Sequence, residues 1–283
     1  MTEAVDLEAL KRQVAAGAAE ARRRARQRLR ASRVALLLGL LGLWEGLSGR
    51  GLDPFFVSAP SKILAALYRM VLEDQLVWHA ALTTTEAVGG YVIGSAVGVI
   101  FAFAATNWGQ LYKVVEPFVL ALNGIPRIAL APLFIMWFGL GVTPKIVIAG
   151  LLVFFIVFMN TVSGIQSANP QLIDLARLMG ASRTDVLRKI VLPSALPFII
   201  TSLRIVVPTA MVGAVVGEFI SAQKGLGFVI NRASFEYNTA AAFAGIALLL
   251  AVVVVLNGLV TLAEARLLRW RPASAAGVAP EAG

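Results

Sequence analysis

Residues 144–166 read PKIVIAGLLVFFIVFMNTVSGIQ, and Lys145 is the only charged residue among them. An apolar run of this length approaches the ~20 residues that an α-helix needs to cross the hydrocarbon core of a bilayer. The composition of the whole chain agrees, because 58% of its 283 residues are hydrophobic and only 14% are charged. Soluble domains carry about 25% charged residues. The sequence therefore predicts an integral membrane protein.

Apolar runs of this kind recur along the chain and predict an all-α, polytopic fold with six transmembrane helices. The first run is short and contains Glu45. Between the first two runs, the segment around Lys62 to Glu73 predicts an amphipathic helix that lies at the membrane surface. The six expected spans are Val34–Leu52, Ala80–Thr106, Val114–Phe138, Pro144–Gln166, Ser194–Gly217 and Ala240–Leu262.

The distribution of positive charge predicts the orientation of the spans. With the N-terminus inside, 17 of the 25 Lys and Arg residues fall in cytoplasmic segments and 6 fall outside, while Arg127 and Arg204 lie within spans. Because positive charge accumulates on the cytoplasmic side, both termini are expected there. The predicted domains are an Arg-rich cytoplasmic arm (1–33), a transmembrane domain (34–270) and a cytoplasmic tail (271–283).

The net charge of +9 does not predict a nucleic-acid partner. Seven arginines lie between residues 22 and 33, just before the first span, where positive charge orients a helix and attracts anionic lipid. Aromatic residues are not interleaved with them, as a surface that stacks bases would require. Membrane lipid is therefore the expected partner of the arm, and a regulatory role for it is left open.

The composition also excludes several kinds of catalytic site. The chain has no cysteine, and its one histidine, His79, cannot build a metal site or a catalytic triad and is expected at the surface. No Gly-Lys-Ser/Thr phosphate loop occurs, so this chain is not expected to bind ATP in the P-loop manner. We therefore predict no enzyme activity and no catalytic, cofactor-binding or metal-binding residue.

The loop between the fourth and fifth spans carries the most specific pattern. Residues 169–193 read NPQLIDLARLMGASRTDVLRKIVLP, which predicts two short helices joined at a glycine, with Pro193 opening the next span. From the residues alone, this is either an elbow that docks onto another protein or an ordinary loop with interfacial helices. The capping residues are Asn169 and Pro170 at the first start, Gly180 at the bend, and Ser182 with Asp185 at the second start.

This loop resembles the EAA loop of binding-protein-dependent ABC importer permeases, whose pattern is E-A-A, three residues, Gly, nine residues, Ile, any residue, Leu-Pro. The same spacings join Asp174-Leu175-Ala176, Gly180, Ile190 and Leu192-Pro193, although Asp replaces Glu and Leu replaces the first Ala. The resemblance implies a type I importer transmembrane domain whose coupling helix sits in a groove of a cytoplasmic ATPase. The residues that it assigns to coupling are Asp174, Leu175, Ala176, Arg177, Gly180, Ala181 and Ser182.

A further resemblance narrows the family. The stretch 123–133, NGIPRIALAPL, and Trp137-Phe138-Gly139 resemble the third span of permeases for nitrate, sulfonates, taurine and bicarbonate. Gly225-Leu226-Gly227, followed by Asn231 and Ala233, is similar to the same group. The likeness covers about residues 60–270.

This resemblance implies a homodimer in the bacterial inner membrane that works with two ATPase subunits, which bind ATP and Mg²⁺, and with an extracytoplasmic solute-binding protein. The implied solute is a small anion, such as a sulfonate, nitrate, bicarbonate or an aromatic carboxylate. A pyrimidine precursor of thiamine is the alternative within the same architecture. A secondary transporter, the alternative from another class, would require acidic residues at mid-membrane and an inverted repeat, and neither is visible.

Two arginines within spans indicate a solute pathway. Arg127 and Arg204 lie roughly 15–20 Å from the cytoplasmic start of their spans at ~1.5 Å per residue, and no carboxylate is expected to pair with them there. Such arginines suit an anionic solute, or else they bond backbone carbonyls freed by Pro126 or Pro208. The acidic residues expected nearer the span ends are Glu45, Glu86, Glu116 and Glu218. The predicted pathway residues are Asn123, Arg127, Arg204 and Met211.

Small residues at a spacing of four occur in the second span. Small side chains on one face let two helices approach closely, so this series is expected to serve packing rather than ligand binding. Its members are Gly89, Gly90, Gly94 and Gly98.

Overall fold

The computed structural model describes residues 7–51, 53–107, 109–221 and 223–267; the first residues of the predicted arm and the predicted tail lie outside these ranges. The described residues form helices and connecting turns without a β-strand, so the predicted all-α fold is confirmed. Contacts divide the chain into two units, Met1–Ala65 and Ala66–Gly283.

In the first unit, one helix, α1 (Leu7–Leu47), runs through both the Arg-rich segment and most of the expected first span. The short helix α2 (Pro54–Val57) follows it. Glu45 of α1 accepts hydrogen bonds from the backbone N–H (2.9 Å) and the hydroxyl (2.7 Å) of Ser61. Ser61 lies in the first turn of α3 (Pro60–Glu73), where backbone N–H groups lack helical partners. The acidic residue of the expected first span therefore caps a neighbouring helix.

The second unit is built around four long helices that agree with four of the expected spans. They are α4 (Leu76–Asn107), α7 (Thr143–Gln166), α10 (Leu192–Ser221) and α12 (Thr239–Leu267). Each is long and apolar enough to cross a membrane, and a bent helix pair provides a fifth candidate. Within the described ranges α1 is not among these candidates, so the count of six spans remains a prediction.

The expected span Val114–Phe138 is not one continuous helix. The chain instead forms α5 (Gly109–Asn123), a 3₁₀ turn η1 (Arg127–Leu130) and α6 (Ala131–Phe138), and the two apolar helices meet at 81°. The break falls at Gly124-Ile125-Pro126. Proline has no backbone N–H and disfavours the helical conformation of the residue before it, so the helix ends there.

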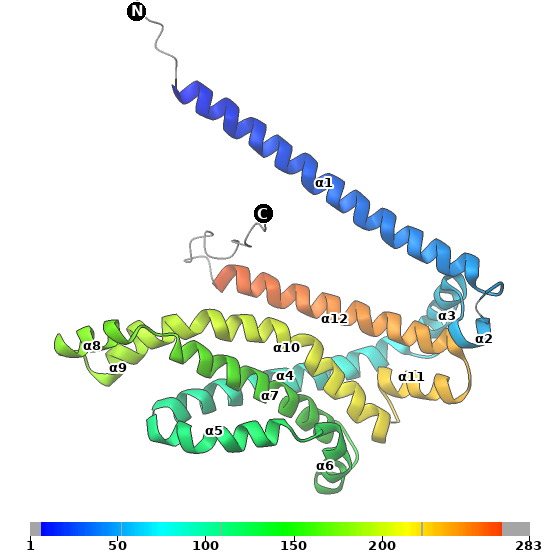
Figure 1. Cartoon of the computed structure of the whole chain (residues 1–283). Helices are drawn as coiled ribbons and strands as arrows, with labels where there is room; N and C mark the ends of the chain where they lie inside the picture. The colour runs from blue at the N-terminus through cyan, green and yellow to red at the C-terminus, as the bar shows by residue number, and fades with distance from the viewer. Residues whose placement is uncertain (1–6, 52, 108, 222, 268–283) are drawn as a thin grey trace, which may run out of the picture. The chain divides into compact units, whose positions relative to one another are not determined.

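Glycine lets α4 and α7 lie close together (Figure 1). A Cβ atom on Gly94 would collide with the carbonyl oxygen of Gly150 in α7. A Cβ atom on Gly90 would collide with the Cβ atom of Ala149 in the same helix. Gly98 makes a similarly close approach to the α7 backbone. The predicted packing role of these glycines is therefore confirmed, because no larger side chain fits between the helices.

α10 packs against α7 as well, so α4, α7 and α10 form the centre of the second unit (Figure 1). A Cβ on Gly213 of α10 would lie 2.5 Å from the Cα of Ala149. Fully buried apolar side chains fill the rest of this contact: Val153 and Val157 of α7, and Val206 and Ala210 of α10.

Substitution of Gly94 by alanine should destabilise the protein by about 1–3 kcal/mol, because the new methyl group forces two backbones apart. The matched control is Gly258→Ala in α12, where nothing lies within 4 Å of the added Cβ. That change should be neutral or slightly stabilising, since alanine favours the helix. Thermal unfolding of the purified variants in detergent measures both effects, and equal unfolding temperatures would contradict the assigned packing.

Candidate functional site

A bent segment of two short helices follows α7, and we refer to residues 169–193 as the elbow. Its first helix, α8 (Pro170–Leu178), starts at Asn169, whose side-chain oxygen accepts a hydrogen bond from the N–H of Gln171 at 2.9 Å. Pro170 occupies the first helical position. Both features confirm the predicted helix start, because a first turn leaves N–H groups without helical partners.

The bend of the elbow lies at Gly180, whose φ of +85° is in the left-handed region. The N–H of Gly180 donates to the carbonyl of Arg177, and the N–H of Ala181 donates to that of Ala176, both at 2.9 Å. This pair of hydrogen bonds closes a helix around a left-handed glycine. The predicted bend is confirmed, and a residue with a side chain would be strained at this position.

A reciprocal pair of hydrogen bonds starts the second helix, α9 (Arg183–Val186). The N–H of Asp185 donates to the hydroxyl oxygen of Ser182 at 3.1 Å, and the N–H of Ser182 donates to the Asp185 carboxylate at 3.3 Å. The predicted capping box is therefore confirmed. Asp185 also forms an ion pair with Lys189, with 2.7 Å between the charged atoms.

The chain passes from α9 into α10 without a break. A π-helical turn, η2 (Leu187–Val191), joins them, so that Arg183–Ser221 is one helix of 39 residues. The expectation that Pro193 opens a new span is therefore wrong. Proline cannot donate to the carbonyl of Lys189, four residues earlier, and the wider turn just before it lets the helix continue past the missing bond.

The first helix of the elbow presents apolar side chains to the surroundings. Leu175, Leu178 and Met179 are 53%, 86% and 80% exposed. Asp174 and Arg177 are exposed as well and form only a loose ion pair at 4.0 Å. A contiguous exposed apolar patch bordered by charges is typical of a protein interaction site.

A buried charge cluster, which the sequence analysis missed, lies at the other end of the central helices. Glu86 of α4, Lys145 of α7 and Glu218 of α10 are 0%, 5% and 1% exposed. Nζ of Lys145 lies 2.8 Å from Oε1 of Glu86. Charges at this degree of burial are stable only when they are paired or hydrogen-bonded. The cluster therefore fixes three helices relative to one another.

Side chains of the same region hold the start of α11 (Leu226–Phe235). Three successive backbone N–H groups, which a helix start leaves without helical partners, each find a side-chain acceptor. Thr83 also donates its hydroxyl proton to Oε1 of Glu218, at 2.7 Å. The three bonds run from Gly225 to Nδ1 of His79 (2.9 Å), from Leu226 to Oγ1 of Thr83 (2.8 Å) and from Gly227 to Oε2 of Glu218 (2.5 Å).

The glycines of the Gly225-Leu226-Gly227 sequence are required by this arrangement. A Cβ on Gly225 or on Gly227 would collide with the carboxylate of Glu218. His79, expected at the surface, is half-buried because its ring accepts the Gly225 bond. Part of this arrangement has a signal in the sequence, since the acidic Glu218 precedes two closely spaced glycines. The other two acceptors, His79 and Thr83 of α4, lie more than a hundred residues away along the chain.

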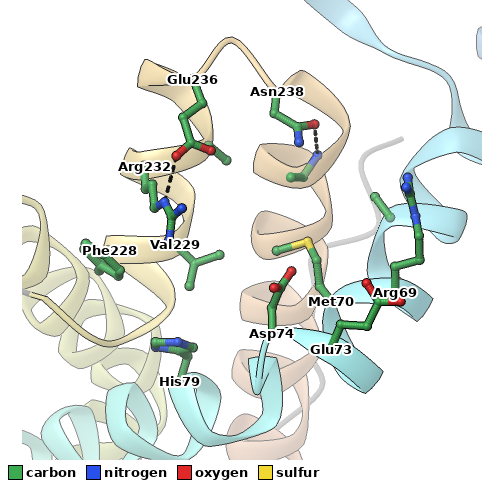
Figure 2. A pocket seen from close by; sticks show the side chains of 13 residues that line it. Arg69, Met70, Glu73, Asp74, His79, Phe228, Val229, Arg232, Glu236 and Asn238 are labelled. Atoms are coloured by element: carbon green, nitrogen blue, oxygen red, sulfur yellow. Dashed lines mark hydrogen bonds and ion pairs between the residues drawn. The ribbon is translucent and has the colours of Figure 1, made fainter.

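A cavity of about 290 Å³ lies beside α11, in the second unit, and Figure 2 shows the side chains that line it. Its walls come from the end of α3, the starts of α4 and α12, and α11. Arg232 pairs at 2.8 Å with Glu236, which follows the last residue of α11, while Asp74 and His79 line the cavity nearby. α11 is thus anchored at its N-terminus and borders open space along the face that carries Arg232.

Residues 94–269, which include the elbow and the start of α11, match the family described as the binding-protein-dependent transport system inner membrane component. The chain belongs to this family. It is therefore an inner-membrane permease component of an ABC transport system, as the EAA-like pattern implied.

Curated relatives of this permease agree with that assignment. The chain is 34% identical to the riboflavin transport system permease protein RibX of Chloroflexus aurantiacus, over 83% of this chain and 88% of the relative. It is 31% identical to the formylaminopyrimidine transport permease protein ThiX of Halalkalibacterium halodurans (83% and 93% covered). It is 30% identical to the taurine transport system permease protein TauC of Escherichia coli (84% and 90% covered). These relatives are permease subunits and not enzymes themselves.

The fold of the permease is similar to that of a solved importer. A chain of the MetNI methionine ABC transporter, in an inward-facing conformation, superposes with a TM-score of 0.55 at 26% identity. The superposition covers 71% of this chain and 97% of that chain. The type I importer architecture expected from the EAA-like loop is thus supported by structure as well as by sequence.

The predicted pathway residues of the permease come from two regions. Asn123 ends α5 and is exposed, and Arg127 begins η1, although its side chain lies outside the described part of the chain. Arg204 of α10 lies 3.8 Å from a carboxylate oxygen of Glu264 in α12, so the expectation that no carboxylate pairs with it is wrong. Met211 is 1% exposed and packs in the core, and its pathway role remains a prediction.

Replacement of Lys145 by alanine should destabilise the permease by about 3–5 kcal/mol, because it leaves the buried Glu86 carboxylate without its partner. Lys189→Ala is the matched control, since this lysine is 75% exposed and an exposed ion pair such as the one it forms with Asp185 contributes little to stability. Unfolding of both purified variants in detergent provides the measurement. Equal losses of stability would contradict a structural role for the cluster.

Proposed function

We propose that the chain is the membrane-spanning subunit of an importer that works as a homodimer with two cytoplasmic ATPase subunits and an extracytoplasmic solute-binding protein. Solute would move inward by alternating access, driven by ATP hydrolysis in the partner subunits. The observation that carries this proposal is the elbow, because its exposed apolar helix and its left-handed glycine coincide with the EAA-like spacing. Membership in a family named for its dependence on binding proteins supports the extracytoplasmic partner.

In this proposal α8 is the coupling helix. Leu175, with Leu178 and Met179, would enter a groove of the ATPase, and burial of one such side chain contributes about 1.5–3 kcal/mol. Gly180 would set the angle between α8 and the long helix that starts at Arg183. The remaining residues of the predicted coupling set are Asp174, Ala176, Arg177, Ala181 and Ser182.

The same proposal places both chain termini and the elbow in the cytoplasm. The excess of Lys and Arg in the segments on that side supports this orientation. α11 lies at the end of the central helices opposite to α8 and α9 (Figure 1) and is bonded to Glu218 of the buried charge cluster, so both would then face the extracytoplasmic side. Six spans per subunit would include the apolar half of α1 and the bent pair α5–α6.

For the solute, we propose a small organic anion such as a sulfonate. The similarity to the taurine permease supports this class, and Arg127 is the residue that would contact the anion. Arg204 contributes less to the argument, since it has a carboxylate neighbour at 3.8 Å. The second candidate is an uncharged heteroaromatic compound such as a pyrimidine precursor of thiamine, which the similarity to ThiX and RibX favours.

Gly180→Val should abolish both uptake and copurification of the ATPase while the protein still inserts into the membrane. A β-branched residue at a φ of +85° is strained and would change the angle of the elbow. The matched control is Gly180→Asn, which tolerates the left-handed conformation and should retain most activity. Uptake is measured in proteoliposomes with ATP and an ionophore. Because the ionophore collapses ion gradients, uptake by the unchanged protein under these conditions excludes a gradient-driven transporter. Normal uptake by the valine variant would refute the coupling role.

Arg127→Gln should lower taurine uptake by about tenfold or more without changing copurification of the ATPase. A hydrogen bond to a charged group is worth about 1.5–3 kcal/mol, and the amide removes the charge. Unchanged taurine transport by this variant would show that Arg127 does not contact the solute, and it would contradict the proposal that the solute is an anion.

A further inference from the structure

A second cavity, of about 330 Å³, lies between the elbow and the ends of the central helices. Phe103 and Thr106, in the last turns of α4, form part of its wall, and Ile165 contributes from the end of α7. Val186, which is buried, closes the cavity from the elbow. The cavity therefore lies where apolar spans give way to polar loops, which is the level of lipid headgroups in a bilayer.

Two arginines make this cavity positively charged. Arg177 of α8 and Arg183 of α9 both line it, and none of its lining residues, all of which belong to the described ranges, is acidic. The nearest carboxylates in sequence already have partners. Asp174 is 72% exposed and makes only a loose contact with Arg177 at 4.0 Å, and Asp185 is bound to Ser182 and Lys189.

The cavity lies on a different face of α8 from the apolar patch. Successive residues of an α-helix are rotated by about 100°, so Ile173 and Arg177 share one face, whereas Leu175 and Leu178 lie on the opposite one. The first pair lines the cavity, and the second pair is exposed. Arg177 belongs to the predicted coupling set, but an ATPase that covers only the apolar patch would leave the cavity-facing side of Arg177, and Arg183, available for another ligand.

We propose that this cavity binds a phosphate-bearing anion, supplied by an anionic phospholipid whose headgroup is held between Arg177 and Arg183. A guanidinium group can donate two parallel hydrogen bonds to a phosphate, and basic pockets between transmembrane helices are suited to anionic headgroups. The apolar wall from Phe103 to Ile165 would cover the glycerol and the first acyl carbons. Free phosphate would use only the two arginines, which is why the lipid is the favoured source.

Thermal unfolding of the purified full-length chain in detergent tests this site while one of three additives is titrated. The additives are dioleoyl-phosphatidylglycerol, dioleoyl-phosphatidylcholine and inorganic phosphate. Phosphatidylglycerol should raise the unfolding temperature saturably, and Arg183→Gln should weaken its apparent affinity by roughly tenfold or more, because a charge-assisted bond is lost. Arg177→Gln should do the same, and it serves as a second, independent variant.

Arg188→Gln is the matched control, since Arg188 is exposed on the same elbow but does not line the cavity. The Arg188→Gln change should alter the apparent affinity for phosphatidylglycerol by less than about twofold. All the variants keep the Arg-rich helix α1, so any lipid that binds to α1 contributes equally to each measurement. Equal affinities of Arg183→Gln and Arg188→Gln would overturn the site, as would equal stabilisation by phosphatidylcholine. Stabilisation by inorganic phosphate as strong as that by phosphatidylglycerol would overturn the lipid as the source.

Discussion

The ion pair between Lys145 and Glu86 is the interaction on which the rest of the second unit depends. A charge in an apolar bundle has no water to solvate it, so it is stable only if the protein supplies an opposite charge or hydrogen bonds. Lys145 and Glu86 come from different helices, and Glu218 on a third helix accepts a hydrogen bond from Thr83 of α4 at 2.7 Å. The register of α4, α7 and α10 is therefore set by charge, whereas an apolar contact alone would allow one helix to slide along another.

Close packing of glycine complements this polar constraint. Gly90 and Gly94 bring α4 against α7, and Gly213 brings α10 against the same stretch of α7. The short distance between backbones is what allows a lysine and a glutamate on neighbouring helices to meet without water between them. The two features support each other, since the charges fix the register in which the small residues face their partners.

The parts of the structure that could be predicted from the sequence are those in which the cause is local. Asn169, Gly180 and Ser182 act on backbone groups within three residues or one helical turn, so capping rules were sufficient to derive the elbow. The break at Pro126 was missed because the prediction relied on apolar length, although the proline itself was a local signal.

The buried cluster could not be derived in this way, because Glu86 and Lys145 are separated by 59 residues along the chain, and Glu218 is 135 residues from Thr83, to which it is hydrogen-bonded. A sequence pattern gives the depth of Glu86 or Glu218 in a span, but not which helix lies opposite. The pairing of Arg204 with Glu264 was missed for the same reason, since the two residues meet only when α10 and α12 are adjacent. Helix adjacency depends on the fit of whole faces, which no single motif encodes.

The unbroken helix from Arg183 to Ser221 has a mechanical consequence. At 1.5 Å per residue, its 39 residues form a rod about 58 Å long. One end of the rod begins directly after Ser182, the N-cap residue of α9 in the elbow. Near the other end, Glu218 accepts a hydrogen bond from the first turn of α11. A displacement of the elbow would therefore be transmitted along this helix, which the π turn and three prolines (Pro193, Pro197 and Pro208) can bend, to the hydrogen bond that Glu218 accepts from Gly227.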